Sequence, residues 1–182
     1  SNYEFGTDIK DAYFVDCGLT YSGTAATSIS GLTHLEGEKI VVLGDGATHP
    51  DRTVSSGAIA LSRSVKKAHI GFNYKSTLQT MRIDAGGTEG TSQGKNKRIN
   101  NITLRLYRSV GVKVGSSEAE IDLIPFRSSA DDMSEALGMF TGDKEVEFRG
   151  GYDNDGFVFV RQDQPLPLTV LAIFPRLQTF DQ

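Results

Sequence analysis

The stretch KIVVLGDGATHPDRTV, residues 39–54, is the clearest indicator of fold in the chain. It begins with a run of Ile, Val and Leu that is too short and too β-branched for a helix. Asp45 and Gly46 follow, and such a pair after an apolar run is a strong hairpin signal because glycine adopts positive φ without steric cost. We therefore predict a β-hairpin whose return strand runs from Thr48 to Val54, with Pro50 restricting part of it to an edge or a bulge.

The segments around this hairpin carry further short strand signals. They are the β-rich runs at 13–21, 58–61 and 68–74. Residues 11–74 therefore hold about five or six short sequential strands. A small antiparallel β-barrel is the economical closure, since a closed sheet leaves no exposed edges. We predict a barrel-like domain over residues 1–74.

The rest of the chain, residues 75–182, predicts a second antiparallel β domain that resembles a sandwich. Ile102, Leu104 and Leu106 alternate with polar residues in the period of two that is typical of a half-buried strand. The same alternation recurs at 110–114, 119–123 and 146–148, and further strand signals occur at 78–83, 157–160 and 168–174. These patterns make the chain as a whole all-β.

Two segments of the second domain predict something other than a strand. Residues 84–101 hold four glycines among polar residues and three cations, so we expect a long Gly-rich loop that has almost nothing to bury. Residues 129–137 give the one helical signal, because Ser129 can cap a helix whose first turn is acidic and whose end is set by Gly138. We therefore expect at most one short helix.

Composition and charge exclude several classes of function. The chain has 182 residues, of which 38% are hydrophobic, which is enough for a hydrophobic core that needs no disulfide or structural metal. Nineteen basic against 23 acidic residues give a net charge of −4, which argues against a dedicated nucleic-acid-binding domain. The single cysteine, Cys17, excludes an intrachain disulfide. No apolar run approaches the roughly 20 residues of a membrane helix, so we expect no membrane span. Ser1 and Asn2 resemble the remnant of a protease site, which suggests a fragment of a longer protein.

We find no recognisable catalytic, cofactor or metal signature in the sequence. Cys17 has no histidine at a spacing typical of cysteine nucleophiles, and the three histidines are scattered. The acidic segment 153–156 resembles the start of a calcium loop, but apolar residues follow it. We predict instead a hairpin turn there, between strands at 145–149 and 157–161. The chain is therefore expected to be no enzyme and to hold no cofactor or metal.

Lys95, Lys97 and Arg98 form a basic cluster at the end of the Gly-rich segment. The cluster does not belong to a phosphate-binding loop, because Glu89 stands where that motif needs glycine and Asn96 stands where it needs Ser or Thr. It is either a contact for an anionic partner or a set of solvated charges that keeps a loop soluble. These three residues are the candidates for partner contact.

Two longer parts of the sequence resemble a known family. The first is DAYFVDCGLTYSG at 11–23, followed by ISGLTHLEG at 29–37 and VVLGDG at 41–46. The second is NNITLRLYRSVG at 100–111, followed by VRQDQPLPLTVL at 160–171. In this order they resemble the C-terminal region of bacteriophage tail nozzle, or tail tubular, proteins of short-tailed phages and prophages. Residues 112–145 depart from the pattern of that family.

The resemblance implies a non-enzymatic structural protein of the virion, part of the tail channel through which DNA is ejected into the bacterial host. It further implies a homo-oligomeric ring, usually six-fold, with contacts to other phage tail proteins, transient passage of DNA, and assembly in the bacterial cytoplasm. The first part also resembles the small β-barrel named after a half-domain of ubiquitin-activating enzymes, which carries no adenylation chemistry. An acidic chain suits a channel, because each neutralised phosphate would add affinity and slow the DNA.

Two other functions stay open at this point. One is a host-surface module in which residues 84–101 or tyrosines such as Tyr74 and Tyr107 bind an envelope polysaccharide. The other is a hydrolase of cell wall or capsule, although no pair of carboxylates stands out among the 23 acidic residues.

Overall fold

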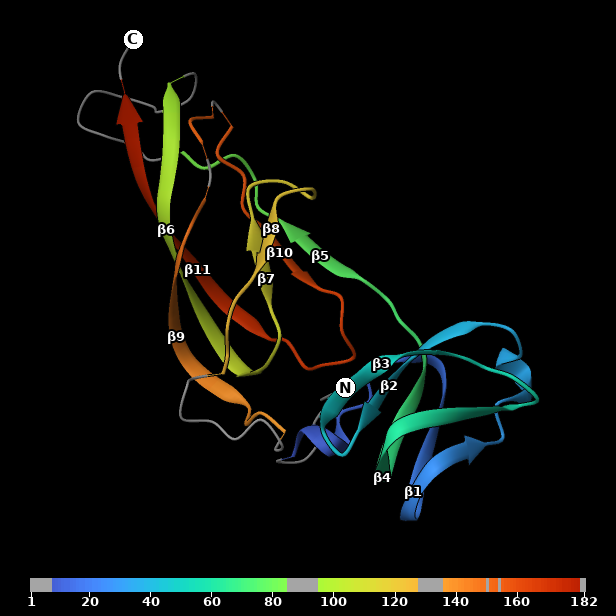
Figure 1. Cartoon of the computed structure of the whole chain (residues 1–182). Coiled ribbons are helices and arrows are strands. Elements are labelled where there is room, and N and C mark those ends of the chain that lie inside the picture. The colour runs from blue at the N-terminus through green and yellow to red at the C-terminus, as the bar shows by residue number, and fades with distance from the viewer. Residues whose placement is uncertain (1–7, 85–94, 128–135, 150, 154, 181–182) are drawn as a thin grey trace. The chain divides into compact units, whose positions relative to one another are not determined.

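The computed structural model describes residues 8–84, 95–127, 136–149, 151–153 and 155–180. Within these residues it is all-β, as predicted, with three antiparallel sheets and two short 3-10 helices (Figure 1). No helix in the described part of the chain is long and apolar enough to cross a membrane. The predicted helix at 129–137 falls mostly outside the described residues, and its last two residues are not helical.

The chain forms two compact units that are not two consecutive stretches of sequence. The first unit comprises Ser1–Lys75, Phe126–Met139 and Asp163–Pro167, and the second comprises Ser76–Pro125, Phe140–Gln162 and Leu168–Gln182. Both later segments of the first unit reach its N-terminal part. The Asn73 side-chain amide donates a hydrogen bond to the Asp163 carbonyl (2.8 Å), and Ala136 lies beside Gly46. A single cut near residue 75 therefore does not separate the units.

The first unit is built on one sheet of four strands. Its elements are the 3-10 helix η1 (Ile9–Asp11), β1 (Asp16–Ser30), the 3-10 helix η2 (Thr33–Leu35), β2 (Lys39–Gly44), β3 (Ala47–Thr53) and β4 (Ala58–Phe72), and the strand order is β1-β4-β2-β3. The predicted hairpin is confirmed, because β2 pairs with β3 across Asp45 and Gly46, whose φ values are 49° and 82°. Pro50 lies on the edge strand β3, beside a shift in register.

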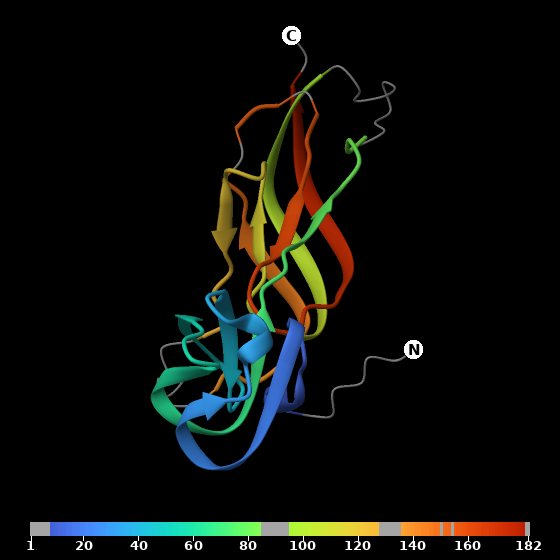
Figure 2. The same cartoon turned by 90° about the vertical axis from the view of Figure 1, so that its right-hand side faces the viewer.

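Strands β1 and β4 are long, which corrects the prediction of separate short strands at 58–61 and 68–74. They run side by side and bend together (Figures 1 and 2), and β4 is continuous over 15 residues. The polar stretch between the two predicted strands stays in the sheet because buried Val65 pairs with Ala26 between two register shifts of β1. The bend wraps the sheet around an apolar core.

The predicted barrel does not close. In the order β1-β4-β2-β3 both β1 and β3 are edge strands, and no ladder joins them within the described residues. The core lies inside the bend and is formed by Ile29, Leu32, Leu35, Ile40, Val42, Val54, Ile59, Leu61, Val65, Ala68 and Ile70. On the same face of the sheet as this core, β3 contributes the polar residues His49 and Arg52 rather than apolar side chains, and its outer edge is unpaired within the described residues.

The second unit contains the other two sheets. Its strands are β5 (Ser76–Gln79), β6 (Asn96–Ser109), β7 (Lys113–Gly115), β8 (Ile121–Leu123), β9 (Phe140–Glu147), β10 (Phe159–Gln162) and β11 (Val170–Phe180). One sheet has the order β5-β10-β7-β8 and the other the order β11-β6-β9. The predicted alternation at Ile102, Leu104 and Leu106 is confirmed, since all three side chains are buried. Val112, Val114, Val158 and Val160 are buried as well.

Two loop predictions in this unit are wrong. Residues 96–101 are not loop but the start of β6, where they pair with β11, and 85–94 lie outside the described residues. The turn at 153–156 does not join β9 to β10, because β9 pairs with β6 while β10 pairs with β5 and β7. Asp153 instead forms a β-bridge with Lys97, and its carboxylate accepts hydrogen bonds from the N–H groups of Asp155 and Gly156.

Candidate interaction surface

The predicted basic cluster does not exist as a patch. Lys97 is 1% exposed, and its backbone is tied to Asp153 by two hydrogen bonds of 2.8 Å. Arg98 is exposed, with its guanidinium 5.7 Å from the centre of the Tyr152 ring, while Lys95 is half-buried and precedes the strand. The cause is the alternation of β6, which turns neighbouring side chains to opposite faces of the sheet. The lysine stem covers apolar surface inside the unit. Of the three residues in the predicted cluster, Arg98 is the one whose side chain is exposed.

The cysteine and histidines lie in separate surroundings. His34 Nε2 lies 3.1 Å from the backbone carbonyl of Cys17, in a contact that does not involve the thiol. His69 is buried between the Thr20 hydroxyl (2.9 Å) and the Lys10 carbonyl (3.0 Å), and burial lowers its pKa. In the part of the chain described, no three His, Cys, Asp or Glu side chains gather in the manner of a metal site.

The outer face of the sheet β11-β6-β9 brings charged and aromatic side chains of the second unit together. Register places residues of the three strands in rows, because directly paired residues share a face of a sheet. One row is Ala172–Arg105–Asp143 and the next is Phe174–Thr103–Glu145. The buried residues Leu104 and Ile102 alternate with these positions on β6, so both rows point away from the core.

Arg105, Asp143 and Phe174 form one cluster on this face, which we call the outer-face cluster. The Arg105 guanidinium donates two hydrogen bonds to the Asp143 carboxylate, of 2.7 and 2.8 Å, and its carbon lies 5.2 Å from the centre of the Phe174 ring. The shared hydrogen bond raises the pKa of Arg105 and lowers that of Asp143. The pair thereby fixes the planar guanidinium near the ring.

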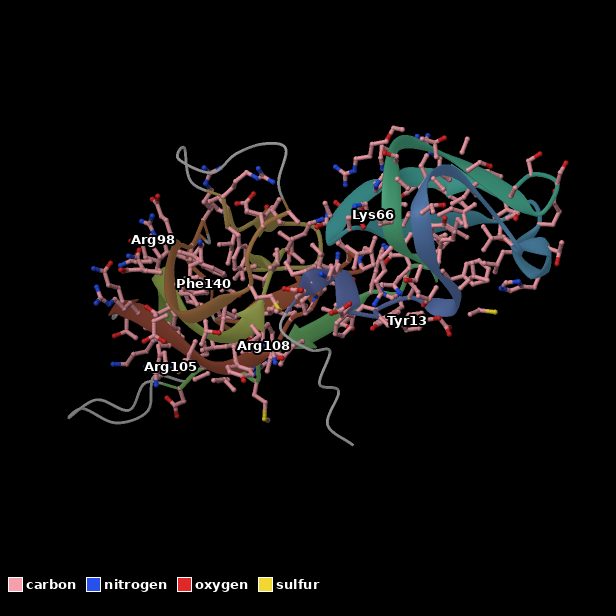
Figure 3. The ribbon with its side chains drawn as sticks, turned by 90° about the horizontal axis from the view of Figure 1, so that it is seen from below. Tyr13, Lys66, Arg98, Arg105, Arg108 and Phe140 are labelled. Atoms are coloured by element: carbon pink, nitrogen blue, oxygen red, sulfur yellow. The ribbon has the colours of Figure 1, made fainter. Side chains whose placement is uncertain are left out.

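Three exposed apolar side chains belong to the strands of this sheet. Phe174 of the cluster is 46% exposed, Tyr107 on β6 is 48% exposed and Leu171 on β11 is 61% exposed. Arg105 lies on the outside of the unit, as Figure 3 shows. Arginine and aromatic residues are enriched in protein–protein interfaces, where they supply most of the binding energy. Because the guanidinium is already paired with Asp143 and lies near the Phe174 ring, the cluster presents a largely preformed contact surface rather than a reactive group.

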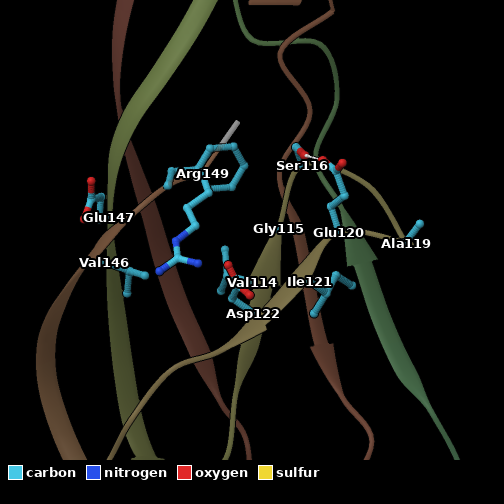
Figure 4. Close-up of a pocket in the computed structure, with 11 residues that line it drawn as sticks. Val114, Gly115, Ser116, Ala119, Glu120, Ile121, Asp122, Val146, Glu147 and Arg149 are labelled. Atoms are coloured by element: carbon cyan, nitrogen blue, oxygen red, sulfur yellow. Dashed lines mark hydrogen bonds between the residues drawn. The ribbon is translucent and has the colours of Figure 1, made fainter. Parts of the chain in front are cut away.

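A pocket lies at the open side of this unit, where the end of β9 faces β7 and β8 (Figure 4). It has a volume of about 310 Å³, at the lower limit for small-molecule sites. The Arg149 side chain extends into it in Figure 4, and the carboxylates of Glu120, Asp122 and Glu147 line it. Glu120 already accepts a hydrogen bond from the Ser116 hydroxyl (3.1 Å). The pocket shows no aligned nucleophile, base and orienting group of the kind hydrolysis requires.

Sequence reasoning missed the outer-face cluster. Its three residues come from strands that are far apart in the chain, and their meeting depends on the register of β6 with β9 and β11. The only signal in the sequence was Arg105 between buried leucines, which places it on the exposed face of a strand.

Comparison with known proteins gives no relative: no family model matches the chain, and no curated protein matches it.

Proposed function

We propose that this chain is a non-enzymatic structural module of a bacteriophage tail, part of the nozzle through which DNA leaves the virion, and that it works by contacts between subunits. The resemblance to tail nozzle proteins supplies the biological setting of this proposal, and it rests on residues 11–23, 29–37, 41–46, 100–111 and 160–171. The structural observation that supports subunit contacts is the outer-face cluster, together with the exposed aromatic and aliphatic side chains on the same strands. Such a surface binds protein without needing a reactive group.

The proposal assigns the outer-face cluster to the contact between neighbouring copies in a ring. A ring closes through heterologous contacts, in which one surface of a subunit binds a different surface of the next. The outer-face cluster offers Phe174 as an apolar anchor and the paired charges of Arg105 and Asp143 to fix orientation. The exposed Tyr107 and Leu171 belong to the same two strands, β6 and β11. A net charge of −4 suits a channel wall, because the lumen then does not retain phosphates.

The test is the molar mass of the chain in solution, measured by multi-angle light scattering across a range of concentrations and checked by particle imaging. We expect a discrete oligomer. Arg105→Glu places a carboxylate beside Asp143 and removes the cation from Phe174, so we expect it to weaken assembly at least tenfold. Lys39→Glu is the matched control, because Lys39 is an exposed cation of the first unit that pairs with the exposed carboxylate of Asp51.

Two results would contradict the proposal. One is a monomer at every concentration, and the other is an oligomer that Arg105→Glu leaves unchanged while the circular dichroism spectrum stays native. An alternative rests on the same exposed rings: Tyr107 and Phe174 suit stacking against the faces of sugar rings, as in a module that binds host polysaccharide. Binding to a glycan panel that is lost in Tyr107→Ala, together with a monomeric chain, would favour that alternative.

A further inference from the structure

The open edge of the first unit carries polar side chains on its inner face. Val42 pairs with His49 and Ile40 pairs with Arg52, with one extra residue on β3 between the two pairs. Because directly paired residues share a face, His49 and Arg52 both lie on the side of the sheet that Ile40 and Val42 bury. The bulge thus directs two nitrogen-rich side chains toward the interior at the edge where the barrel stays open.

His49 is buried, and one of its ring nitrogens has no partner. Arg63 on β4 donates a hydrogen bond from Nε to His49 Nε2 (2.9 Å), so the neutral ring carries its proton on Nδ1. That Nδ1 is buried and has no hydrogen-bond partner among the residues that the structure describes, and His49 is 7% exposed. Burial lowers the pKa of His49, and the nearby charges of Arg63 and Arg52 lower it further. The ring is therefore held neutral, as a hydrogen-bond donor at Nδ1.

Arg52 has an unpartnered donor as well, and it lines a pocket. Its Nε is buried without a hydrogen-bond partner, and among the described residues no carboxylate forms an ion pair with it. The pocket has a volume of about 580 Å³ and lies between the end of β3, the end of β1 and the start of β4. Its polar lining consists of Arg52 and three hydroxyl residues, Ser28, Thr53 and Ser55, with no acidic side chain.

We propose that this pocket, the seam pocket, binds an oxyanion through Arg52. Buried donors are normally satisfied, and an unsatisfied one costs about 1–3 kcal/mol. A guanidinium next to hydroxyl groups in a pocket without carboxylates supplies both the charge and the donors that a phosphate or carboxylate group accepts. The charges of Arg63 and Arg52 both lower the pKa of His49, so a second guanidinium adds to the positive potential around the neutral ring. The inference does not depend on the proposed assembly function.

The experiment is a titration of the ¹⁵N-labelled chain with inorganic phosphate at constant ionic strength, with sodium chloride as the compensating salt. We expect saturable shifts of the amide signals of residues 52–55 and 58–61. Arg52→Gln should weaken binding at least tenfold. Arg176→Gln, which removes an equally charged and highly exposed side chain from the second unit, should leave it unchanged. Ser55→Ala tests the same pocket if Arg52→Gln does not fold.

Acetate, titrated in the same way, identifies the source of the oxyanion. Saturable binding of acetate would assign the pocket to a carboxylate, such as an acidic side chain of a partner, and binding of phosphate alone would assign it to a phosphate group. The proposal is overturned if neither anion shifts the signals around Arg52, or if Arg52→Gln and Ser55→Ala both bind as the unmodified chain does. Arg52 and the neutral His49 would then be inward-pointing polar side chains that only protect an edge strand from pairing.

Discussion

Replacing Gly44 at the end of β2 is predicted to destabilise the fold, because its lack of a side chain makes room for the His49 ring. A Cβ added at Gly44 would lie 2.6 Å from Val65 Cγ1 and 2.7 Å from His49 Nε2, both closer than contacts of real Cβ atoms. Overpacking of this kind costs about 1–3 kcal/mol, and loss of the hydrogen bond from Arg63 to His49 adds about 0.5–1.5 kcal/mol. Alanine also reduces the conformational entropy of the unfolded chain, which stabilises the folded state by about 0.4–1 kcal/mol. We expect Gly44→Ala to lower the free energy of unfolding by about 2 kcal/mol, within a net range of about 0.5–4 kcal/mol for these terms.

Urea denaturation followed by circular dichroism measures this loss. Gly138→Ala is the matched control, because a Cβ there meets no atom within 4 Å, and we expect it to change stability by less than about 1 kcal/mol. Val65→Ala removes one of the two clashing groups, so the cost of Gly44→Ala should fall in that background. Equal stability of Gly44→Ala and Gly138→Ala would refute the close packing of His49 against Gly44.

Two further predictions concern the cores and the histidines. Leu104→Ala should destabilise the chain by about 2–5 kcal/mol, and Thr103→Ala on the opposite face of β6 by less than about 0.5 kcal/mol, as measured by urea denaturation; similar losses would contradict the assigned faces. His49 and His69 have folded pKa values below the unfolded value of 6.5, so the unfolded chain binds more protons and stability should fall as the pH drops below about 6.5. The melting temperature between pH 7.5 and 5.5 measures this loss, and a double His49→Gln/His69→Gln variant should show a smaller slope.

The sequence predicted those elements whose signal is local. The hairpin at Asp45 and Gly46 needs only a short apolar run and a turn pair, and it forms as expected. The alternation at Ile102, Leu104 and Leu106 marks one buried face without reference to the partner strands. Where structure depends on which distant strand is the neighbour, the prediction failed. The turn at 153–156 was assigned to a hairpin because β9 and β10 are consecutive, but they belong to different sheets.

The candidate sites follow the same division. Lys97 and Arg98 look alike in sequence, and only their place on β6 shows that the first is buried and the second is exposed. The outer-face cluster and the seam pocket each combine residues from at least two strands, so neither is visible before the register is known. Arg52 is a case in point: without the bulge in β3 its side chain would lie on the outer face, as an ordinary surface charge.

The discontinuous first unit has a consequence for synthesis on the ribosome. Its sheet is complete in sequence by residue 75, but the segment at 163–167 that belongs to the same unit is made 167 − 75 = 92 residues later. At about 5–20 residues per second, the nascent sheet waits roughly 5–18 seconds for that segment. During this interval Asn73 lacks the Asp163 carbonyl that accepts its hydrogen bond, while the strands of the second unit are being made. Expression of residues 1–75 alone would therefore yield this intermediate, not the finished unit.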